Sequence, residues 1–241
     1  YVAPDGTTYH FGKQLGSSGA DALTWLLTKV TDRNGNSLTY AYNNATPPQV
    51  ASITHSCGRG VTFDYSVAHE IQVHDSVDAG GKAAVRYVLD SASDTKLEKV
   101  MKLVDASVTG DAAYETVTYQ YGNHDVEDQR YHDANANLLT DIFDPRGVRV
   151  LHNEYQEITT GLAGNLASQT DAAKKTTTYT YNTDGTLSVS RSFSGGTRQM
   201  KVTHDASGAV SGVFEPTDGS PGTATQAAQN TYDNRGRLIA Q

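Results

Sequence analysis

The chain has 241 residues, of which 37 % are hydrophobic, and a formal net charge of −8. This length allows one large all-β domain or two small domains, and the low apolar fraction favours thin sheets with a wetted face. The acidic balance, without any basic stretch interleaved with aromatics, disfavours nucleic-acid binding. Cys57 is the single cysteine, so an intrachain disulfide is excluded, and no apolar stretch has membrane-spanning length.

Short strands and glycine turns are predicted for the first 43 residues. Leu26–Gly35 is a strand that runs into a turn, and the returning strand alternates with period two and ends at Tyr42. Glycine in such a turn supplies the positive φ that a tight hairpin requires. From 47 to 113 the pattern is irregular, and within it the alternation of Leu97, Met101 and their neighbours predicts a strand preceded by a loop.

The same pattern returns between 131 and 241. Leu138–Gly147 matches Leu26–Gly35, and its returning strand ends at Tyr155. A third copy begins at Leu166–Asp171 and closes at Tyr181. The stretch 212–230 is rich in Pro and Gly, and we predict an inserted loop there.

A second signature follows the closing aromatic residue: aromatic-polar-x-x-Gly-x-Leu/Val. It occurs at Tyr181–Leu187 and Tyr232–Leu238, and at His204–Val210 with His in the aromatic place. The anchors from Tyr155 onward are 26, 23 and 28 residues apart, a period typical of stacked supersecondary units. The expected structural repeat positions are Tyr42, Tyr155, Tyr181, His204, Tyr232, Gly35, Gly147, Gly185, Gly208 and Gly236.

Each copy is a β-hairpin, which cannot bury its apolar face alone. Neighbouring hairpins are therefore expected to pair edge to edge in one long antiparallel sheet. Because strands twist, such a sheet is expected to curve or spiral. The predicted fold class is all-β, built from repeated antiparallel hairpins.

Metal-binding patterns are weak. His69-Glu70 begins a zinc-protease motif, but the next histidine, His74, comes five residues after the first and not four. Asp32–Asn36 alternates oxygen donors as a calcium loop does, but its glycine comes one position early and no Glu closes it. His124–Asp133 offers donors for a divalent ion, and a hydrated loop is the simpler interpretation.

Catalytic patterns are equally weak. Cys57 and His55 can share one strand face, but the sequence names no orienting partner for them. Ser17-Ser18 lacks the nucleophile-elbow pattern. The tyrosine pairs of the strands could stack sugars, although cross-strand packing is the commoner use. We therefore expect no enzyme, no catalytic residue, no cofactor and no metal.

Tyr232–Leu238 resembles the YD-repeat consensus of the Rhs, teneurin and Tc-toxin superfamily. Asp32–Asn36 and Asp144–Gly147 resemble the hairpin turns of the same repeats, and Pro4–Phe11 is similar to a segment that often precedes a repeat array. The resemblance is clear over 1–43 and 131–241. On this resemblance residues 1–241 form a single module, expected to be a fragment of the repeat region and part of a β-shell.

The resemblance implies a structural segment of a β-shell, or cocoon, that serves toxin encapsulation or delivery. It further implies a polymorphic toxin of interbacterial competition, secreted, at the cell surface or delivered by a secretion system. The expected partners are the remainder of a larger Rhs-type polypeptide, its enclosed C-terminal toxin domain and the secretion machinery. Two alternatives stay open: an adhesion or carbohydrate-binding module, and a hydrolase that gathers His55, His69, His74, His124 or His132 in a cleft.

Overall fold

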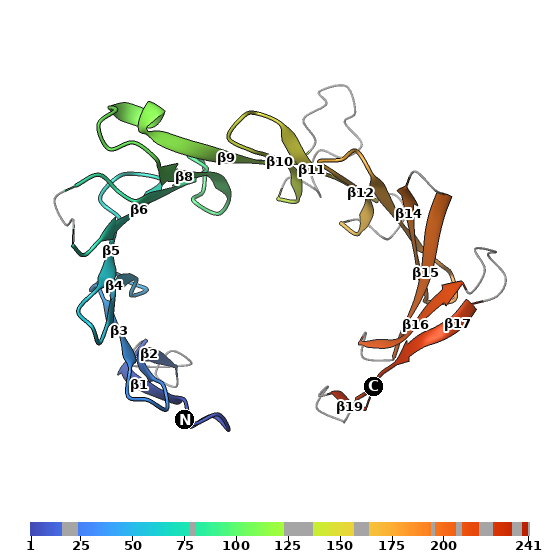
Figure 1. The fold of residues 1–241 in the computed structure, drawn as a ribbon, viewed down its shortest axis with the longest axis horizontal. Coiled ribbons are helices and arrows are strands. Elements are labelled where there is room, and N and C mark those ends of the chain that lie inside the picture. The colour runs from blue at the N-terminus through green and yellow to red at the C-terminus, as the bar shows by residue number, and fades with distance from the viewer. Residues whose placement is uncertain are drawn as a thin grey trace. The chain divides into compact units, whose positions relative to one another are not determined.

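A computed structural model describes residues 1–15, 24–77, 81–122, 137–156, 164–193, 196–205, 209–216, 224–232 and 238–240. The chain divides into two compact units, Tyr1–Val117 and Thr118–Gln241, and each is described by itself. Our sequence prediction was one module. The strands of each unit follow one another in chain order, each beside the strand before it (Figure 1).

Unit 1 is a sheet of antiparallel strands that pair in chain order, from β1 with β2 through to β7 with β8. A short 3-10 helix, η2 (Gly110–Ala113), leads into β9 (Tyr114–Tyr121), which crosses the boundary between the units. The strands are β1 (Thr8–Gln14), β2 (Trp25–Thr31), β3 (Ser37–Tyr42), β4 (Val50–His55), β5 (Gly60–Asp64), β6 (Glu70–Asp75), β7 (Val85–Leu89) and β8 (Leu97–Leu103).

Unit 2 continues in the same way. The end of β9, Thr118–Tyr121, pairs with β10, and the strands from β10 to β17 pair antiparallel with their neighbours in chain order. A separate two-stranded ribbon joins β18 (Thr231–Tyr232) and β19 (Leu238–Ala240). The other strands are β10 (Leu139–Phe143), β11 (Arg149–Tyr155), β12 (Leu166–Asp171), β13 (Thr176–Tyr181), β14 (Leu187–Phe193), β15 (Gly196–His204), β16 (Val210–Pro216) and β17 (Ala224–Gln229).

The prediction of an all-β chain built from repeated antiparallel hairpins is confirmed. The strand predicted near 97–103 is β8, and turns precede it as expected. Residues 47–113, where the sequence repeat is irregular, contain the strands β4 to β8.

One expectation needs correction: most of the predicted inserted loop at 212–230 lies in β16 and β17, which pair with each other from Gly212↔Gln229 to Pro216↔Ala224. Its centre, 217–223, lies outside the described residues. Its prolines mislead for a physical reason. Pro216 ends β16, where the missing N–H does not interrupt a strand interior, and Pro221 lies outside the described residues.

The sheet has little hydrophobic core. Among the described residues, the buried hydrophobic side chains are Ala83, Met101, Ala113 and Val202, none more than 8 % exposed. No large side chain in that part of the chain is fully buried. Most strand residues are half-buried on both faces. A single layer of this kind depends on cross-strand contacts and on its turns, because the described residues of each unit form no second layer over it.

Candidate functional site

The turn at Asp32 shows how one side chain closes a hairpin. The backbone N–H of Gly35 donates to the Asp32 carbonyl at 3.1 Å, and the N–H of Asp32 donates to the Asn36 carbonyl at 2.9 Å. Oδ1 of Asp32 accepts the N–H groups of Asn34 and Asn36, at 2.8 and 2.9 Å. Gly35 has φ of 87°, so the turn is a type I turn closed by a glycine bulge. The carboxylate thus accepts hydrogen bonds within the turn, which favours the hairpin interpretation over a calcium loop.

The same turn recurs at Asp144 and at Asp171. Oδ1 of Asp144 accepts the N–H of Arg146 and of Val148, both at 2.9 Å, and Gly147 has φ of 74°. In the third copy the positive-φ position is held by Lys174, with φ of 59°. A lysine in this region is strained relative to glycine. The hydrogen bonds of this third turn are Lys174 N–H to the Asp171 carbonyl, and the N–H groups of Ala173 and Lys175 to Asp171 Oδ1.

A fourth copy has histidine in place of aspartate. Gly58, with φ of 88°, donates to the His55 carbonyl at 2.9 Å, and His55 donates to the Arg59 carbonyl at 2.7 Å. His55 Nδ1 accepts the N–H of Cys57 at 3.1 Å, in the role that Oδ1 has elsewhere. His55 and Cys57 are therefore turn residues with a backbone contact, and this geometry does not point the imidazole at the exposed thiol as a base.

Of the three other predicted turn glycines, one lies among the described residues. Gly185, with φ of 78°, closes a turn by donating to the Asn182 carbonyl at 3.0 Å. Gly208 and Gly236 lie outside the described residues. Asp205 accepts the N–H of Ala209 with Oδ1 at 3.0 Å.

Four of the hairpins share a second contact, namely those whose turns begin at Asp32, His55, Asp144 and Asp171. At the end of each hairpin opposite the turn, a tyrosine hydroxyl donates a hydrogen bond to the other strand, and we call this contact the tyrosine clamp. The tyrosine lies at or just after the end of the second strand, and its hydroxyl donates to a main-chain carbonyl near the start of the first. The four clamps are Tyr42 to Leu27 at 2.7 Å, Tyr65 to Val50 at 2.8 Å, Tyr155 to Leu139 at 2.6 Å and Tyr181 to Leu166 at 3.1 Å.

Turn and clamp together define one repeating unit. The carbonyl residue precedes the turn residue by five positions in all four copies, as from Leu27 to Asp32. The tyrosine follows the turn residue by ten positions in three copies, as from Asp32 to Tyr42, and by eleven in the Asp144 copy. Burial raises the pKa of all four phenol groups above the usual value, so each hydroxyl keeps its proton and remains a donor.

Tyr65 is the clamp that sequence reasoning missed. Its copy lies in the stretch that looked irregular, because the turn His55-Ser-Cys-Gly-Arg lacks the aspartate of the other turns. The usable signal was the spacing, with a positive-φ glycine three residues after the turn residue and a tyrosine ten after it. Among the predicted anchors, His204 ends β15 with an exposed side chain, and the side chain of Tyr232 lies outside the described part of the chain.

The tyrosine pairs of the strands pack against neighbouring side chains of the sheet. The rings of Tyr40 and Tyr42 are half-buried, and so are the other rings proposed as a sugar platform, which are those of Tyr119, Tyr121, Tyr179 and Tyr181. The hydroxyls of Tyr42 and Tyr181 are held by backbone carbonyls. These contacts favour cross-strand packing over an open stacking surface for sugars.

A polar network of unit 1 surrounds Arg86. Its guanidinium binds Glu70 through two nitrogens, at 2.6 and 2.7 Å, and Asp111 through the third, at 2.6 Å. The guanidinium also lies 5.2 Å from the ring centre of Tyr114. Glu70 is only 8 % exposed, and the Arg86 hydrogen bonds hold its pKa below the usual value. Both charges are paired, so the network joins β6, β7 and η2 and is structural.

The described histidines that were proposed for a zinc site or a hydrolase cleft are not brought together, and Nδ1 of His74 is buried without a hydrogen-bond partner. His69 Nδ1 lies 2.6 Å from Asp94 Oδ1, whereas His74 lies in β6 opposite Thr62. No group of three His, Cys, Asp or Glu residues that could hold a metal ion is found in the described ranges. His124 and His132, with the acidic stretch between them, and Ser17-Ser18 lie outside those ranges.

One cluster in unit 2 has the residue types of a hydrolytic triad. His152 Nδ1 lies 2.8 Å from Asp141 Oδ1, across the β10–β11 pair. Ser168, however, donates its hydroxyl to Glu154 at 2.7 Å and not to the imidazole. Nucleophilic catalysis needs the hydroxyl within hydrogen-bond reach of the base, so this geometry supports cross-strand pairing of polar groups.

No family model matches the chain, and no curated protein matches it in sequence. Among solved structures, the Photorhabdus luminescens Tc holotoxin pore is similar over 88 % of this chain at 14 % identity and a TM-score of 0.38. The chain spans 12 % of the length of that neighbour.

A second solved structure is a porin-like protein from Bacteroides uniformis. The similarity covers 84 % of this chain and 81 % of the other, at 11 % identity and a TM-score of 0.27. Within the described residues, no helix is long and apolar enough to cross a membrane.

Proposed function

We propose that the chain is a structural wall segment of a YD-repeat β-shell, which encloses or delivers a toxin. The observation that carries the proposal is the repeating unit of turn and tyrosine clamp, present in four copies in the described residues. A repeated hairpin closed at both ends builds a sheet of any length from local contacts. That is the property required of a wall, because each added unit needs only its neighbour.

The distribution of burial supports the same function. Four buried hydrophobic residues in the described ranges are far fewer than a two-layered domain of this length requires. The side chains on both faces of the sheet keep part of their surface exposed, so each face can contact a partner. We infer that one face lines an enclosed space and the other faces solvent, and that the enclosed partner is a toxin domain of the complete polypeptide.

The polar chemistry described above supports structure over catalysis. The turn carboxylates accept backbone N–H groups, and Glu70 is paired with Arg86. If the cargo is a toxin, the protein acts outside the producing cell, by secretion or delivery, in competition between bacteria. This part of the proposal depends on the toxin cargo. The remainder of the polypeptide and the secretion machinery are then the natural partners.

Protease protection tests the enclosure. The complete polypeptide that carries this chain is digested under native conditions, and its non-repeat domain is followed by mass spectrometry. The proposal predicts that this domain survives until the repeat sheet is unfolded, whereas the same domain expressed alone is digested. Equal digestion rates in the two forms would contradict enclosure, even if the sheet itself folds as described.

A further inference from the structure

Two potential metal-ligand atoms face each other on β11 of unit 2. Nε2 of His152 lies 3.8 Å from Oε1 of Glu154. The two residues are two positions apart in the strand, so their side chains share one face of the sheet. The separation is too long for a hydrogen bond, and within the described ranges Nε2 of His152 makes no other hydrogen bond. The surroundings of this pair show why both atoms stay free.

Asp141 sets the tautomer and the orientation of the imidazole. Its Oδ1 lies 2.8 Å from Nδ1 of His152, directly across the β10–β11 pair. An ionised carboxylate only accepts hydrogen bonds, so Nδ1 carries the proton and Nε2 of the neutral ring keeps its lone pair. The Asp141 side chain is 10 % exposed, and Arg149 lies 3.3 Å from the same oxygen and compensates its charge. A nitrogen lone pair and a carboxylate oxygen therefore face each other between His152 and Glu154.

Ser168 holds the second ligand in a similar way. Its hydroxyl donates to Oε2 of Glu154 at 2.7 Å, across the β11–β12 pair. Ser168 is only 9 % exposed, so its hydroxyl has little freedom to turn away. The other oxygen of the carboxylate, Oε1, stays available on the side of His152. Both ligand side chains are accessible, at 28 % exposed for His152 and 63 % for Glu154, so an ion from solvent can reach them.

The 3.8 Å separation suits two ligands of one divalent ion. Zinc binds imidazole nitrogen at about 2.0–2.1 Å and carboxylate oxygen at about 2.0–2.2 Å. Two such ligands lie about 3.4 Å apart at a tetrahedral angle, and at most about 4.2 Å apart. A closure of about 0.4 Å is therefore enough for tetrahedral binding, and the exposed Glu154 side chain permits it. The charges agree, because Asp141 and Glu154 carry two negative charges against the single positive charge of Arg149.

The geometry points to a metal site: we propose that Nε2 of His152 and Oε1 of Glu154 bind a divalent ion of the zinc class, with water at its remaining positions. A metal-bound histidine usually donates its other ring N–H to a carboxylate, and a metal-bound carboxylate is hydrogen-bonded in turn. Asp141 and Ser168 supply these two contacts. The site has two protein ligands, so it is distinct from the groups of three that the described ranges lack. The proposed wall function does not require it.

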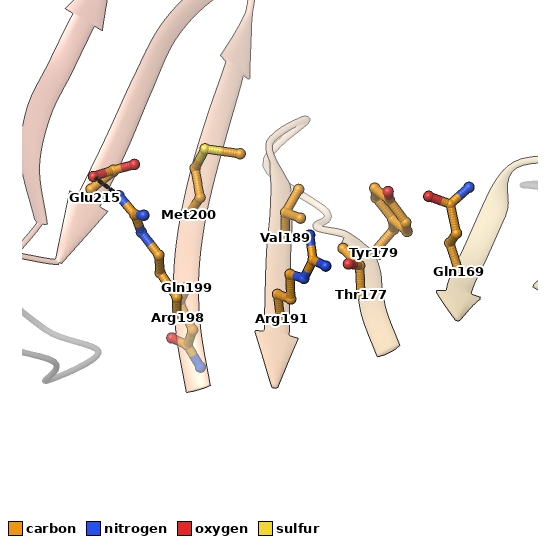
Figure 2. A pocket seen from close by; sticks show the side chains of 9 residues that line it. All are labelled: Gln169, Thr177, Tyr179, Val189, Arg191, Arg198, Gln199, Met200 and Glu215. Carbon is orange, nitrogen blue, oxygen red and sulfur yellow. Dashed lines mark hydrogen bonds and ion pairs between the residues drawn. The ribbon is translucent and has the colours of Figure 1, made fainter. Parts of the chain in front are cut away.

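The other face of the unit 2 sheet carries a hollow of about 570 Å³, lined in part by Gln169 of β12. Figure 2 shows its charged side chains, with Arg198 linked to Glu215. Arg191, opposite Arg198 in the register, is likewise paired with a carboxylate, at 2.7 Å. The charges of the hollow are thus used in pairs, whereas the histidine and glutamate of β11 keep a nitrogen and an oxygen for an ion.

NMR of the imidazole nitrogens locates the ion. The chain has eight histidines, and the ring signals of His152 are identified by their absence in H152N. Zn²⁺ is added to the chain at a pH above the histidine range, and Mg²⁺ serves as the comparison ion because it prefers oxygen ligands. The proposal predicts a saturable shift of the Nε2 signal of His152 with Zn²⁺, and no shift with Mg²⁺ at the same concentration.

Variants separate the ligands from the residues that orient them. S168A and D141N weaken Zn²⁺ binding by about ten-fold or more, because loss of the contacts that orient metal ligands typically costs this much. E154Q removes a ligand and weakens binding further. H204N, at an exposed histidine that ends β15 of the same unit, leaves the His152 shift unchanged.

Three outcomes would overturn the proposal. One is no shift of the His152 Nε2 signal at millimolar Zn²⁺, and another is equal Zn²⁺ binding by the parent chain and E154Q. The third is a Zn²⁺ shift confined to other histidines, which would place the ion elsewhere. Glu154 is 63 % exposed, so E154Q tests the ligand without loss of the fold. If D141N loses its native signals, S168A alone tests the orienting contacts, and binding equal to that of the parent would contradict them.

Discussion

Replacing Tyr42 by Phe tests the tyrosine clamp most cleanly. The variant removes the 2.7 Å hydrogen bond to the Leu27 carbonyl and keeps the ring, including its contact with the Lys13 ammonium 5.6 Å from the ring centre. A single hydrogen bond of this kind contributes about 1 kcal/mol net. We therefore expect Tyr42→Phe to lower the free energy of unfolding of unit 1 by about 1 kcal/mol.

Urea unfolding followed by the fluorescence of Trp25 measures this change locally. Trp25 is the single tryptophan, and it begins β2, the strand that receives the clamp. The control is Tyr40→Phe, in the same strand two residues earlier, because the Tyr40 hydroxyl makes no hydrogen bond in the described part of the chain. Tyr42→Phe and Tyr40→Phe with equal unfolding free energies would refute the clamp as a source of stability.

Tyr155 gives an internal check on the same reasoning. The Leu139 carbonyl also accepts the side-chain amide of Asn153 at 3.0 Å, so it stays paired when the Tyr155 hydroxyl is removed. Tyr155→Phe should therefore cost less than Tyr181→Phe, whose carbonyl at Leu166 receives one side-chain donor in the structure. A larger loss at Tyr155 would show that ring packing, and not the hydroxyl, decides the effect.

Further predictions concern turns, pH and the hollow. In thermal melts, Lys174→Gly should stabilise by about 0.5–1 kcal/mol and Gly147→Ala should destabilise by about 1 kcal/mol, because both positions have positive φ. Hydrogen bonds from the threonine two residues on lower the pKa of Asp184 to about 2. The contribution of Asp184 to the free energy of unfolding is complete above the unfolded-state pKa near 4 and is lost as the pH falls toward 2. Asp184→Asn should therefore remove this part of the loss of stability in acid. A double-mutant cycle of R191Q and R198Q should give a repulsive coupling of about 0.2–1 kcal/mol that salt reduces.

These predictions have distinct refutations. A stability loss in Lys174→Gly would show that the lysine side chain matters more than its backbone strain. An acid midpoint unchanged by Asp184→Asn would remove that carboxylate from the pH dependence. An attractive coupling between the two arginines would contradict the view that they are held together against their charge.

The sequence was sufficient for the parts of the fold that rest on local chemistry. Gly35 and Gly147 lie in turns whose backbone requires positive φ. The period-two alternation of the sequence predicts strands that end at Tyr42, Tyr155 and Tyr181, and the structure has these strand ends. These features are encoded within about sixteen residues, so periodicity and turn chemistry reveal them. What the sequence did not reveal is that the three tyrosines make the same hydrogen bond, because the carbonyl that each one reaches belongs to another strand.

The missed features depend on residues far apart in the chain. The copy closed by Tyr65 carries His55 where the others carry Asp, and a nitrogen acceptor there was not anticipated. β17 has few β-branched or aromatic residues, and it forms because β16 supplies its hydrogen-bonding partner. The hollow, and the pair of His152 and Glu154 with its orienting partners, each combine side chains of several strands, so both become visible only once the register is known.

Face-selective labelling of the complete polypeptide tests the central claim most directly. Glu98 and Lys99 are adjacent exposed residues of β8 and point to opposite faces of the sheet. Cysteines placed there one at a time, with Cys57 replaced by Ser, are treated with a polyethylene-glycol maleimide. The account predicts that both react in the isolated chain, and that in the complete polypeptide one reacts while the other stays unlabelled until denaturation. Equal labelling of both positions in the native complete polypeptide would contradict a wall that encloses a cargo.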